Sequence, residues 1–306
     1  MKVVVSGGSG FIGKQIVSEL LRAGHRVTVL SRDPSRARAA GDPRATFALF
    51  SPSQTFEVGT FDGCDAVINL AGEGVADARW TDARKAILRS SRIATTTALA
   101  RAVAALAEKP KVFVSASAIG IYGFREDGST SDESDHHGSD FLATLCEEWE
   151  AAAEPARAAG IRVAHPRIGI VLGTGGGALK EMLPPFRAFA GGPLGSGEQF
   201  MSFVHEHDAV RAILFPLETE ALAGPYNVTA PSPVTMDTFA RTLGKVLGRP
   251  SVARVPAFVL RTILGEERAN IVLAGHRVVP ARLESLGFRF EHPALEGALR
   301  DLLRAG

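Results

Sequence analysis

The feature that most constrains the fold is a glycine-rich loop placed directly after the first apolar segment. Residues 2–5 read Lys-Val-Val-Val, and Ser6 is followed by Gly7, Gly10 and Gly13 at the head of an apolar stripe typical of a helix. Gly7 allows a tight turn, Gly10 lets a phosphate approach the backbone, and Gly13 lets the helix pack against the sheet. Because a helix N-terminus carries free N–H groups and partial positive charge, the pattern predicts a site for the pyrophosphate of a dinucleotide. Without such a ligand, the loop is an ordinary glycine turn of an α/β protein.

The second expected strand, residues 26–30, ends in a pair of residues that bears on the choice of cofactor. Ser31 and Arg32 offer a hydroxyl and a guanidinium, which suit the 2′-phosphate of NADP better than the ribose hydroxyls of NAD. Asp33 leaves an alternative open, since a shift of one residue would place a carboxylate near the ribose. A second alternative is that Arg32 is only a solvated surface charge. The sequence favours NADP(H).

Apolar segments and helical stretches alternate through the first half of the chain. Further strands are expected at residues 45–50, 65–70, 111–115 and 161–167, with helices that include residues 83–107 and 141–159. This order predicts an α/β fold with a Rossmann-type doubly wound parallel sheet, whose ligand crevice lies at the carboxyl ends of the strands.

Glycine and proline become frequent from Gly173 onward, and this change predicts a second lobe. Helical patterns follow at residues 236–247 and 258–264. We therefore expect an NADP-binding Rossmann domain at residues 1–172 and a smaller α+β substrate lobe at residues 173–306, of which some segments can return to the sheet.

Composition narrows the class of partner. The 306 residues include 34 basic and 33 acidic side chains, so the net charge of +1 indicates neither a nucleic acid nor an anionic membrane as the partner. No apolar run approaches the roughly 18 residues of a membrane span, and the two cysteines do not form a disulfide framework. The chain opens directly into the glycine loop, which leaves no room for a cleavable signal. We expect a cytoplasmic protein with a small-molecule substrate and leave the oligomeric state open.

Several segments, taken in order, resemble the extended short-chain dehydrogenase/reductase superfamily. They are residues 7–13, Ser31-Arg32, Asn69-Leu70-Ala71-Gly72, residues 115–123 and residues 202–208. The chain is more narrowly similar to the atypical subgroup called epimerase family proteins, described as nucleoside-diphosphate-sugar epimerases with a C-terminal domain of unknown function. Further matches to it are Ser91-Arg92-Ile93, Trp149-Glu150, residues 173–179, residues 195–197 and Val279-Pro280. The resemblance covers nearly the whole chain and implies an NADP(H)-dependent oxidoreductase or epimerase-like enzyme acting on a small polar carbonyl compound or a sugar nucleotide.

The predicted cofactor site is drawn from the ends of the first, second, fourth and fifth strands. The small residues 69–72 can flank the cofactor without obstructing it, although a buried strand end is their alternative role. Arg92 enters through the resemblance to the subgroup, near a position where the superfamily usually has an asparagine. The full set is Gly7, Ser9, Gly10, Phe11, Ile12, Gly13, Ser31, Arg32, Asn69, Leu70, Ala71, Gly72, Arg92 and Ser115.

The chemistry departs from the superfamily, whose usual base is a tyrosine activated by a lysine four residues later. Tyr122 is followed at that spacing by Glu126, and Tyr226 by Ala230, so the chain contains no YxxxK. Residues 141–146 stand where the motif is expected, with a downstream acidic position kept as Glu150. Oxidation of an alcohol, as in ordinary epimerase chemistry, therefore lacks its base.

A neutral hydroxyl still donates a proton, so reduction of a carbonyl by NADPH is the more plausible direction. We assign Ser117 to hydrogen-bond the substrate carbonyl and Tyr122 to act as a nearby acid or orienting group. The alternative is that Ser117 satisfies the backbone at a strand end and Tyr122 packs in a turn. A second function stays open: a non-catalytic regulatory protein in which NADPH occupancy sets lobe closure and partner affinity.

The remaining candidates are weaker. His205 and His207 with Asp208 resemble a metal cluster, but Asp208 precedes an apolar run and is expected to be a helix N-cap, so no metal site is predicted. Cys146 is expected to be a buried small residue rather than a nucleophile. Arg167 is equally consistent with a ligand contact in the interlobe cleft and with a structural salt bridge. The pair His136-His137 is expected in an exposed loop.

Overall fold

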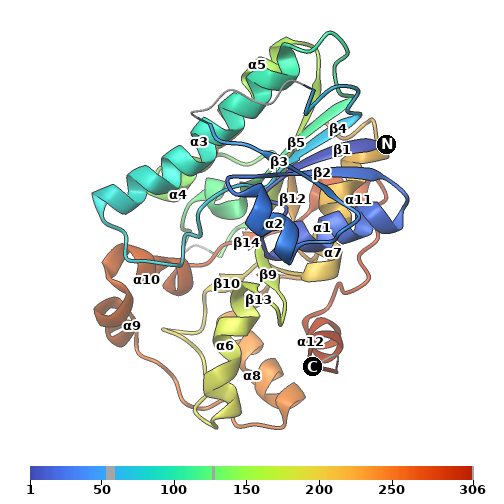
Figure 1. The fold of residues 1–306 in the computed structure, drawn as a ribbon. Helices are drawn as coiled ribbons and strands as arrows, with labels where there is room; N and C mark the ends of the chain where they lie inside the picture. Colours follow the sequence, from blue (N-terminus) through green and yellow to red (C-terminus); the bar gives the residue numbers. More distant parts are fainter. Residues whose placement is uncertain (53–58, 126–127, 305–306) are drawn as a thin grey trace.

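The predicted parallel sheet is present in the computed structural model, which describes residues 1–52, 59–125 and 128–304, and it lies in the upper part of the molecule in Figure 1. Its strands are β1 (Lys2–Ser6), β2 (Arg26–Ser31), β3 (Thr46–Leu49), β4 (Ala66–Asn69), β5 (Val112–Ser115), β8 (Arg162–Ile168) and β12 (Gly224–Val228). They lie in the order β12-β8-β5-β4-β1-β2-β3, and every neighbouring pair is parallel. Because β1 lies between β2 and β4, the winding reverses there, and in doubly wound folds the ligand crevice lies at the carboxyl ends of the strands beside this reversal. The expected fold class is confirmed.

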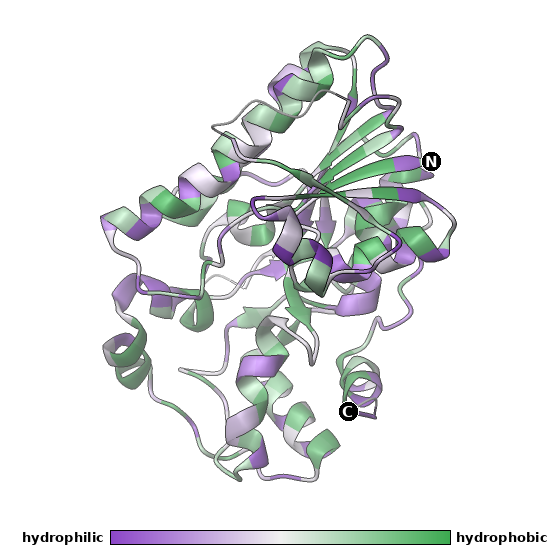
Figure 2. Cartoon of the chain, in the orientation of Figure 1, coloured by the Kyte–Doolittle hydropathy of each residue, from purple (hydrophilic) through white to green (hydrophobic). Residues whose placement is uncertain are grey.

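Both faces of the sheet are buried, which explains the nearly continuous apolar strands (Figure 2). Val3 and Val5 of β1 face helices α1 (Phe11–Arg22) and α7 (Glu206–Leu214). Val4 faces the opposite core, which is covered by α3 (Asp82–Ala104) and α5 (Glu154–Ala158). Successive strand residues therefore enter different cores, as the period of two in a strand requires.

Part of the second half of the chain returns to this sheet. Strand β12 pairs with β8, and Val210 and Ile213 of α7 belong to the core beneath β1. A separate core lies between α6 (Gly177–Arg187), α8 (Met236–Leu247) and α12 (Leu295–Arg304), in the lower part of Figure 1. The division at residue 172 stays a prediction, and β12 and α7 are segments beyond it that lie on the sheet.

The remaining elements are short. They are α2 (Pro34–Ala40), β6 (Ser117–Ala118), η1 (Ile119–Tyr122), β7 (Thr130–Ser131), α4 (Phe141–Ala151), β9 (Ile170–Leu172), β10 (Phe200–Met201), β11 (Phe203–His205), η2 (Phe215–Leu217), β13 (Val234–Thr235), α9 (Ala257–Leu264), α10 (Glu266–Leu273), β14 (Arg277–Val278) and α11 (Ala281–Ser285). Among the described residues, no helix combines the length and the apolar character needed to cross a bilayer.

Two local predictions are wrong. The helix expected over residues 141–159 is two helices, α4 and α5, because Pro155 lacks the N–H that a continuous helix would need and instead lies in the first turn of α5. Asp208 is not the N-cap of α7, since His205 takes that place and its ring accepts from the N–H of His207 at 3.1 Å. Asp208 lies within the first turn of the helix and is fully buried.

The glycine loop is closed by contacts that leave no space for side chains. Gly7 has a φ of +77°, a conformation that glycine adopts without strain. A Cβ added to Gly13 would lie 2.1 Å from the carbonyl oxygen of Gly7, so the first turn of α1 packs directly on the loop backbone. The helix is thus positioned by the loop as well as by the sheet.

We expect Gly13→Ala to lower the free energy of unfolding by about 1–3 kcal/mol, because the methyl group forces the loop away from α1. Gly297→Ala in α12 is the control, since its added Cβ meets no atom within 4 Å. It is expected to raise stability by up to about 1 kcal/mol through helix propensity. Urea unfolding measures both, and equal effects of the two changes would contradict the close packing at Gly13.

Candidate cofactor and substrate site

The register of the sheet brings polar residues from distant parts of the chain into two rows. Ser6 is paired with Asn69, and Asn69 with Ser115, across β1, β4 and β5. Paired residues of parallel strands point to the same face, so these side chains line one edge of the crevice.

The second row continues on the neighbouring strands. Arg167 of β8 is paired with Ser117 of β6 on one side and with Asn227 of β12 on the other. Asn69 and Ser115 of the first row belong to the predicted cofactor site, and the second row contains both Ser117 and Arg167.

The N-terminus of α1 is built to accept an anion. Gly10 is the N-cap and makes no side-chain hydrogen bond to the helix, and Ser9 and Gly10 are exposed. The N–H groups of the first turn therefore have no side-chain cap competing with a phosphate. The Phe11 ring packs against the glycine segment after β9, where Cβ atoms added to Gly173 and Gly176 would lie 2.4 and 2.5 Å from it.

The end of β2 favours Arg32 over Asp33 as the group that meets the ribose. The Asp33 carboxylate caps α2 by accepting from the N–H of Arg36 at 3.0 Å, and the Ser31 hydroxyl is hydrogen-bonded to the Asp33 backbone. The Arg32 side chain is 84% exposed, with Nη2 3.7 Å from the Glu73 carboxylate. A guanidinium is thus available beside the crevice, while the carboxylate of the alternative is already engaged.

Asn69 organises the turn after β4. Its side chain is buried, donates to Thr96 Oγ1 at 2.8 Å and accepts from the N–H of Ala71 at 3.3 Å. Residues 70–72 are thereby held beside Gly7, whose added Cβ would lie 2.7 Å from the Leu70 carbonyl carbon. Asn69 therefore fixes the backbone next to the glycine loop. The alternative expected for it, a buried polar residue at a strand end, describes its contacts in the structure.

Arg92 is a buried cation at the crevice. Its guanidinium donates to the carbonyl oxygens of Glu73 at 2.9 Å and Leu88 at 3.2 Å, and lies 5.1 Å from the ring centre of Trp149. Gly72 packs against it, since an added Cβ would be 3.2 Å from Arg92 Cζ. Burial lowers the pKa of Arg92 from its ordinary value.

Helix α4 carries no tyrosine–lysine pair toward the crevice. Leu142 and Cys146 lie one helical turn apart and both contact the Gly120 region of η1. Burial raises the pKa of the Cys146 thiol to about 12, so the thiol stays protonated and is a poor nucleophile. The positive charge near this position is that of Arg92, which interacts electrostatically with Cys146.

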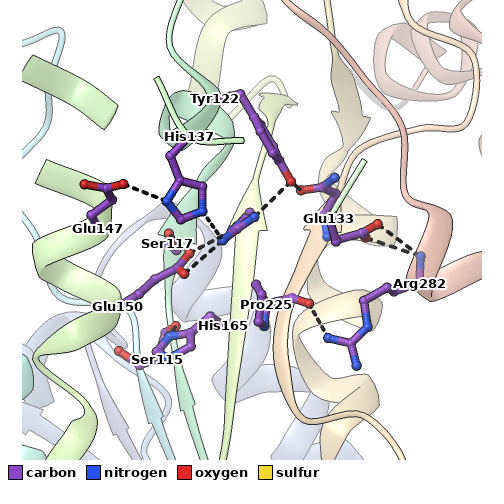
Figure 3. Close-up of polar contacts among 12 residues, drawn as sticks. Ser115, Ser117, Tyr122, Glu133, His137, Glu147, Glu150, His165, Pro225 and Arg282 are labelled. Atoms are coloured by element: carbon purple, nitrogen blue, oxygen red, sulfur yellow. Dashed lines mark hydrogen bonds and ion pairs between the residues drawn. The ribbon is translucent and has the colours of Figure 1, made fainter. Parts of the chain in front are cut away.

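A buried ion pair organises the substrate side of the site (Figure 3). Arg167 is 2% exposed and donates from Nε to Glu150 Oε1 at 2.8 Å and from Nη2 to Oε2 at 3.1 Å. The same guanidinium donates to the Tyr122 hydroxyl at 3.0 Å and to His137 Nε2 at 3.2 Å. Ser117 Oγ donates to Glu150 Oε1 at 2.7 Å. Of the two roles expected for Arg167, a ligand contact and a structural salt bridge, the structure shows the salt bridge.

The charges of this network follow from its contacts. Burial pushes the pKa of Glu150 upward, but the hydrogen bonds and charge of Arg167 outweigh it and hold the pKa below its ordinary value. Burial raises the pKa of Tyr122 to about 12 despite the neighbouring Arg167. At neutral pH the carboxylate is ionised and the phenol keeps its proton, so Tyr122 cannot act as a base.

Ser117 and Tyr122 differ in what they offer a substrate. The Tyr122 hydroxyl is 2.8 Å from Asn227 Oδ1, to which it donates, while it accepts from Arg167, and its side chain is 1% exposed. Of its two expected roles, this geometry favours the orienting one. Among the described residues, the hydrogen bond of the Ser117 hydroxyl is its donation to Glu150, and Ser117 lies in β6, which pairs with β8.

The contacts of four residues of this network were not anticipated from the sequence. His137 was expected in an exposed loop, and although its loop is at the surface, its ring joins Arg167 to Glu147, whose Oε1 is 2.7 Å from Nδ1. Asn227 Oδ1 accepts a hydrogen bond from the Tyr122 hydroxyl, and the backbone N–H of Asn227 donates to Glu133 Oε1 at 2.8 Å. Sequence spacing gives no signal for these contacts, because they depend on loop 132–140 and on the return of β12.

One buried polar atom remains available in the first row. Among the described residues, Ser115 is fully buried and its Oγ has no hydrogen-bond partner. A buried hydroxyl without a partner is costly and often marks the place of a ligand or an ordered water. Together with the uncapped α1 and the closed glycine loop, this atom is consistent with a dinucleotide along the strand ends.

The doubly wound sheet and its uncapped glycine loop define a dinucleotide-binding protein of the Rossmann class. The chain belongs to the NAD dependent epimerase/dehydratase family, whose model matches residues 3–229. A second family, a domain of unknown function named DUF1731, matches residues 255–302.

The similar proteins span the whole chain. An Arabidopsis thaliana protein named epimerase family protein SDR39U1 homolog, chloroplastic, is 39% identical over 99% of this chain and 87% of its own length. The Bacillus subtilis epimerase family protein YfhF is 37% identical over 99% of this chain and 98% of its own. The crystal structure of human epimerase family protein SDR39U1 with NADPH has a TM-score of 0.86 at 33% identity and covers 99% of both chains. The resemblance drawn from the motifs is confirmed.

We expect Glu150→Ala to lower the free energy of unfolding by about 3–5 kcal/mol, because it leaves the buried Arg167 charge unpaired. Glu19→Ala, which removes the exposed pair with Arg22, is the control and is expected to cost less than about 1 kcal/mol. Thermal or urea unfolding compares them. A similar cost for the two changes would contradict the importance of the buried pair.

The same pair has a pH signature. The pKa of Glu150 is lower in the folded than in the unfolded chain. Glu150 therefore contributes fully to the free energy of unfolding above the unfolded pKa of about 4.3, and this contribution is lost as the pH falls through the folded pKa. This part of the acid sensitivity is expected to be absent from Glu150→Ala.

Proposed function

We propose that this chain binds NADP(H) and uses NADPH to reduce the carbonyl group of a small polar compound, with a sugar nucleotide as one candidate class. The observation that carries the cofactor is the exposed Arg32 guanidinium at the end of β2, whose contact in the structure is a loose ion pair with Glu73. The neighbouring Asp33 carboxylate is already used to cap α2. The human relative with NADPH supports the same choice. A cytoplasmic location and a small-molecule partner are parts of this proposal.

Different residues of the crevice bind different parts of the cofactor. The N–H groups at the start of α1 take the pyrophosphate, and Arg32 takes the 2′-phosphate through charge-assisted hydrogen bonds. Cys146 is a neutral thiol in the segment where the superfamily has its lysine. The buried Arg92 guanidinium lies nearby and supplies a fixed positive charge in that region. Ser115 offers its unpartnered hydroxyl.

When bound, NADPH supplies the hydride that reduces the carbonyl carbon, and a proton must reach the carbonyl oxygen. Ser117 turns its hydroxyl from Glu150 to this oxygen and passes on a proton that water replaces. The carboxylate stays satisfied during this turn, because both of its oxygens remain bonded to Arg167. Tyr122 holds Arg167 in place. Glu150, the carboxylate bonded to Ser117, is a weak base for the reverse reaction because its pKa is lowered.

One observation favours a second function, in which the chain is a regulatory protein that binds NADPH without consuming it. The two hydroxyl-bearing candidates, Ser117 and Tyr122, are 2% and 1% exposed and both bonded within the protein. In that case NADPH would bind tightly and would not be consumed.

Arg32→Ala is expected to weaken NADPH binding by about 10- to 100-fold and to leave NADH binding nearly unchanged, because a charged hydrogen bond to the 2′-phosphate is worth about 1.5–3 kcal/mol. Calorimetric titration measures both affinities. Arg22→Ala is the control, since Arg22 is an exposed residue at the far end of α1. Equal loss of NADPH and NADH affinity would show that Arg32 does not read the 2′-phosphate.

Ser117→Ala is expected to lower NADPH consumption at least about 100-fold with NADPH affinity retained, since it removes the proton donor. The assay follows NADPH absorbance with a panel of carbonyl compounds and sugar nucleotides. Ser285→Ala, at an exposed serine of α11, is the control. Tight NADPH binding with no consumption by the unaltered protein would instead support the regulatory function.

A further inference from the structure

A cluster of histidines and carboxylates lies apart from the crevice, where α7, α12 and the segment before α12 meet. His207 in the first turn of α7 and the adjacent residues Glu291 and His292 each offer a ligand atom within 4.8 Å of the others. Asp301 of α12 adds a carboxylate oxygen 4.0 Å from His292 Nε2. The two imidazoles and two carboxylates come from three separate parts of the chain.

The backbone of this cluster is held by a buried carboxylate. Asp208 is fully buried and accepts from the N–H groups of Glu291 at 2.9 Å and His292 at 2.8 Å. This contact fixes the segment 291–292 against the first turn of α7, next to His207. It also explains why Asp208 is unavailable as a helix cap. The side chains of His207, Glu291 and His292 are thus held close together by buried hydrogen bonds to the backbone.

Two side chains orient the proposed ligands. The His205 ring stacks on the His292 ring with centres 3.9 Å apart. Arg211 Nη1 is 3.3 Å from Glu291 Oε1, which leaves Oε2 to face His207 Nδ1 at 3.3 Å. Tetrahedral zinc with bonds of about 2.0 Å separates its ligand atoms by about 3.3 Å, so this pair already has the required spacing.

We propose that His207, Glu291 and His292 bind a divalent transition-metal ion. Imidazole and carboxylate together suit Zn²⁺ and similar ions, whereas Mg²⁺ and Ca²⁺ prefer oxygen ligands alone. The two carboxylates offset the partial positive charge that the N-terminus of α7 presents to a cation.

His205 is outside the proposed ligand set, although it is the most buried histidine of the group. Its Nδ1 accepts from the N–H of His207 at 3.1 Å, so Nε2 carries the ring hydrogen and cannot coordinate an ion. Nε2 lies instead 3.4 Å from Asp301 Oδ2. The His205 ring therefore serves as the surface on which the His292 ring stacks.

The site would fasten the C-terminal helix to the cofactor lobe. Helix α7 contacts α1 through Gln15, whose Nε2 donates to Glu206 Oε2 at 2.8 Å. An ion shared between α7 and the segment leading to α12 stabilises the folded chain by mass action, since the ligands are together only when it is folded. The inference does not depend on the proposed reduction, because no residue of this cluster belongs to the crevice.

The test uses the full chain with any affinity tag removed and with metals stripped by a chelator that is then dialysed away. Calorimetric titration with Zn²⁺ is expected to show one ion per chain, with a rise in melting temperature. Co²⁺ is expected to give the visible absorption of a low-coordinate site with nitrogen ligands. His207→Ala and His292→Ala should each weaken the Kd at least about 10-fold, and His136→Ala, at an exposed histidine elsewhere, should not.

Two results would overturn the proposal: no saturable Zn²⁺ binding up to millimolar concentration, or binding that persists unchanged when His207 and His292 are both replaced. Glu291→Gln keeps the test decisive if a histidine variant does not fold, because it removes a charge from a half-exposed side chain without removing volume. NADPH affinity is measured alongside, so that loss of the fold is distinguished from loss of the ion.

Discussion

The buried ion pair between Arg167 and Glu150 is the interaction on which the rest of the candidate site depends. Removing both charges from water is costly, and only their mutual hydrogen bonds and those to neighbouring groups compensate for it. Each compensating group comes from a different part of the chain: Ser117 from β6, Tyr122 from η1 and His137 from the following loop. The pair thereby sets the positions of Ser117, Tyr122 and His137, and a change in either partner affects all three.

The sequence predicted those parts of the fold that depend on local patterns. The glycine loop, the apolar strands and the long helix α3 follow from residues within one or two turns of each other, and the structure has them within a few positions. The N-cap of α7 could not be predicted in this way. Asp208 is a good capping residue, but the N–H groups of residues 291 and 292 need its carboxylate, and that need is visible only when the chain is folded.

The two halves of the candidate site differ in the same respect. The cofactor half lies where individual strands end, so motifs in the sequence indicated Arg32, Asn69 and Ser115. The substrate half is assembled by the pairing of β6, β8 and β12, which places Ser117, Arg167 and Asn227 in one row. Asn227 is far from both partners in the sequence, and His137 lies in a loop with no periodicity, so neither could be found from spacing alone.

The return of β12 to the sheet has a consequence for how the chain can be divided. If the polypeptide ended after β9, the outer side of β8 would present unpaired N–H and C=O groups, and the apolar surface under β1 would lose Val210 and Ile213. An open strand edge beside uncovered apolar surface recruits other chains. The amino-terminal portion therefore makes a poor fragment for expression, and fusions are better placed next to the exposed residues Met1 and Arg304 than after β9.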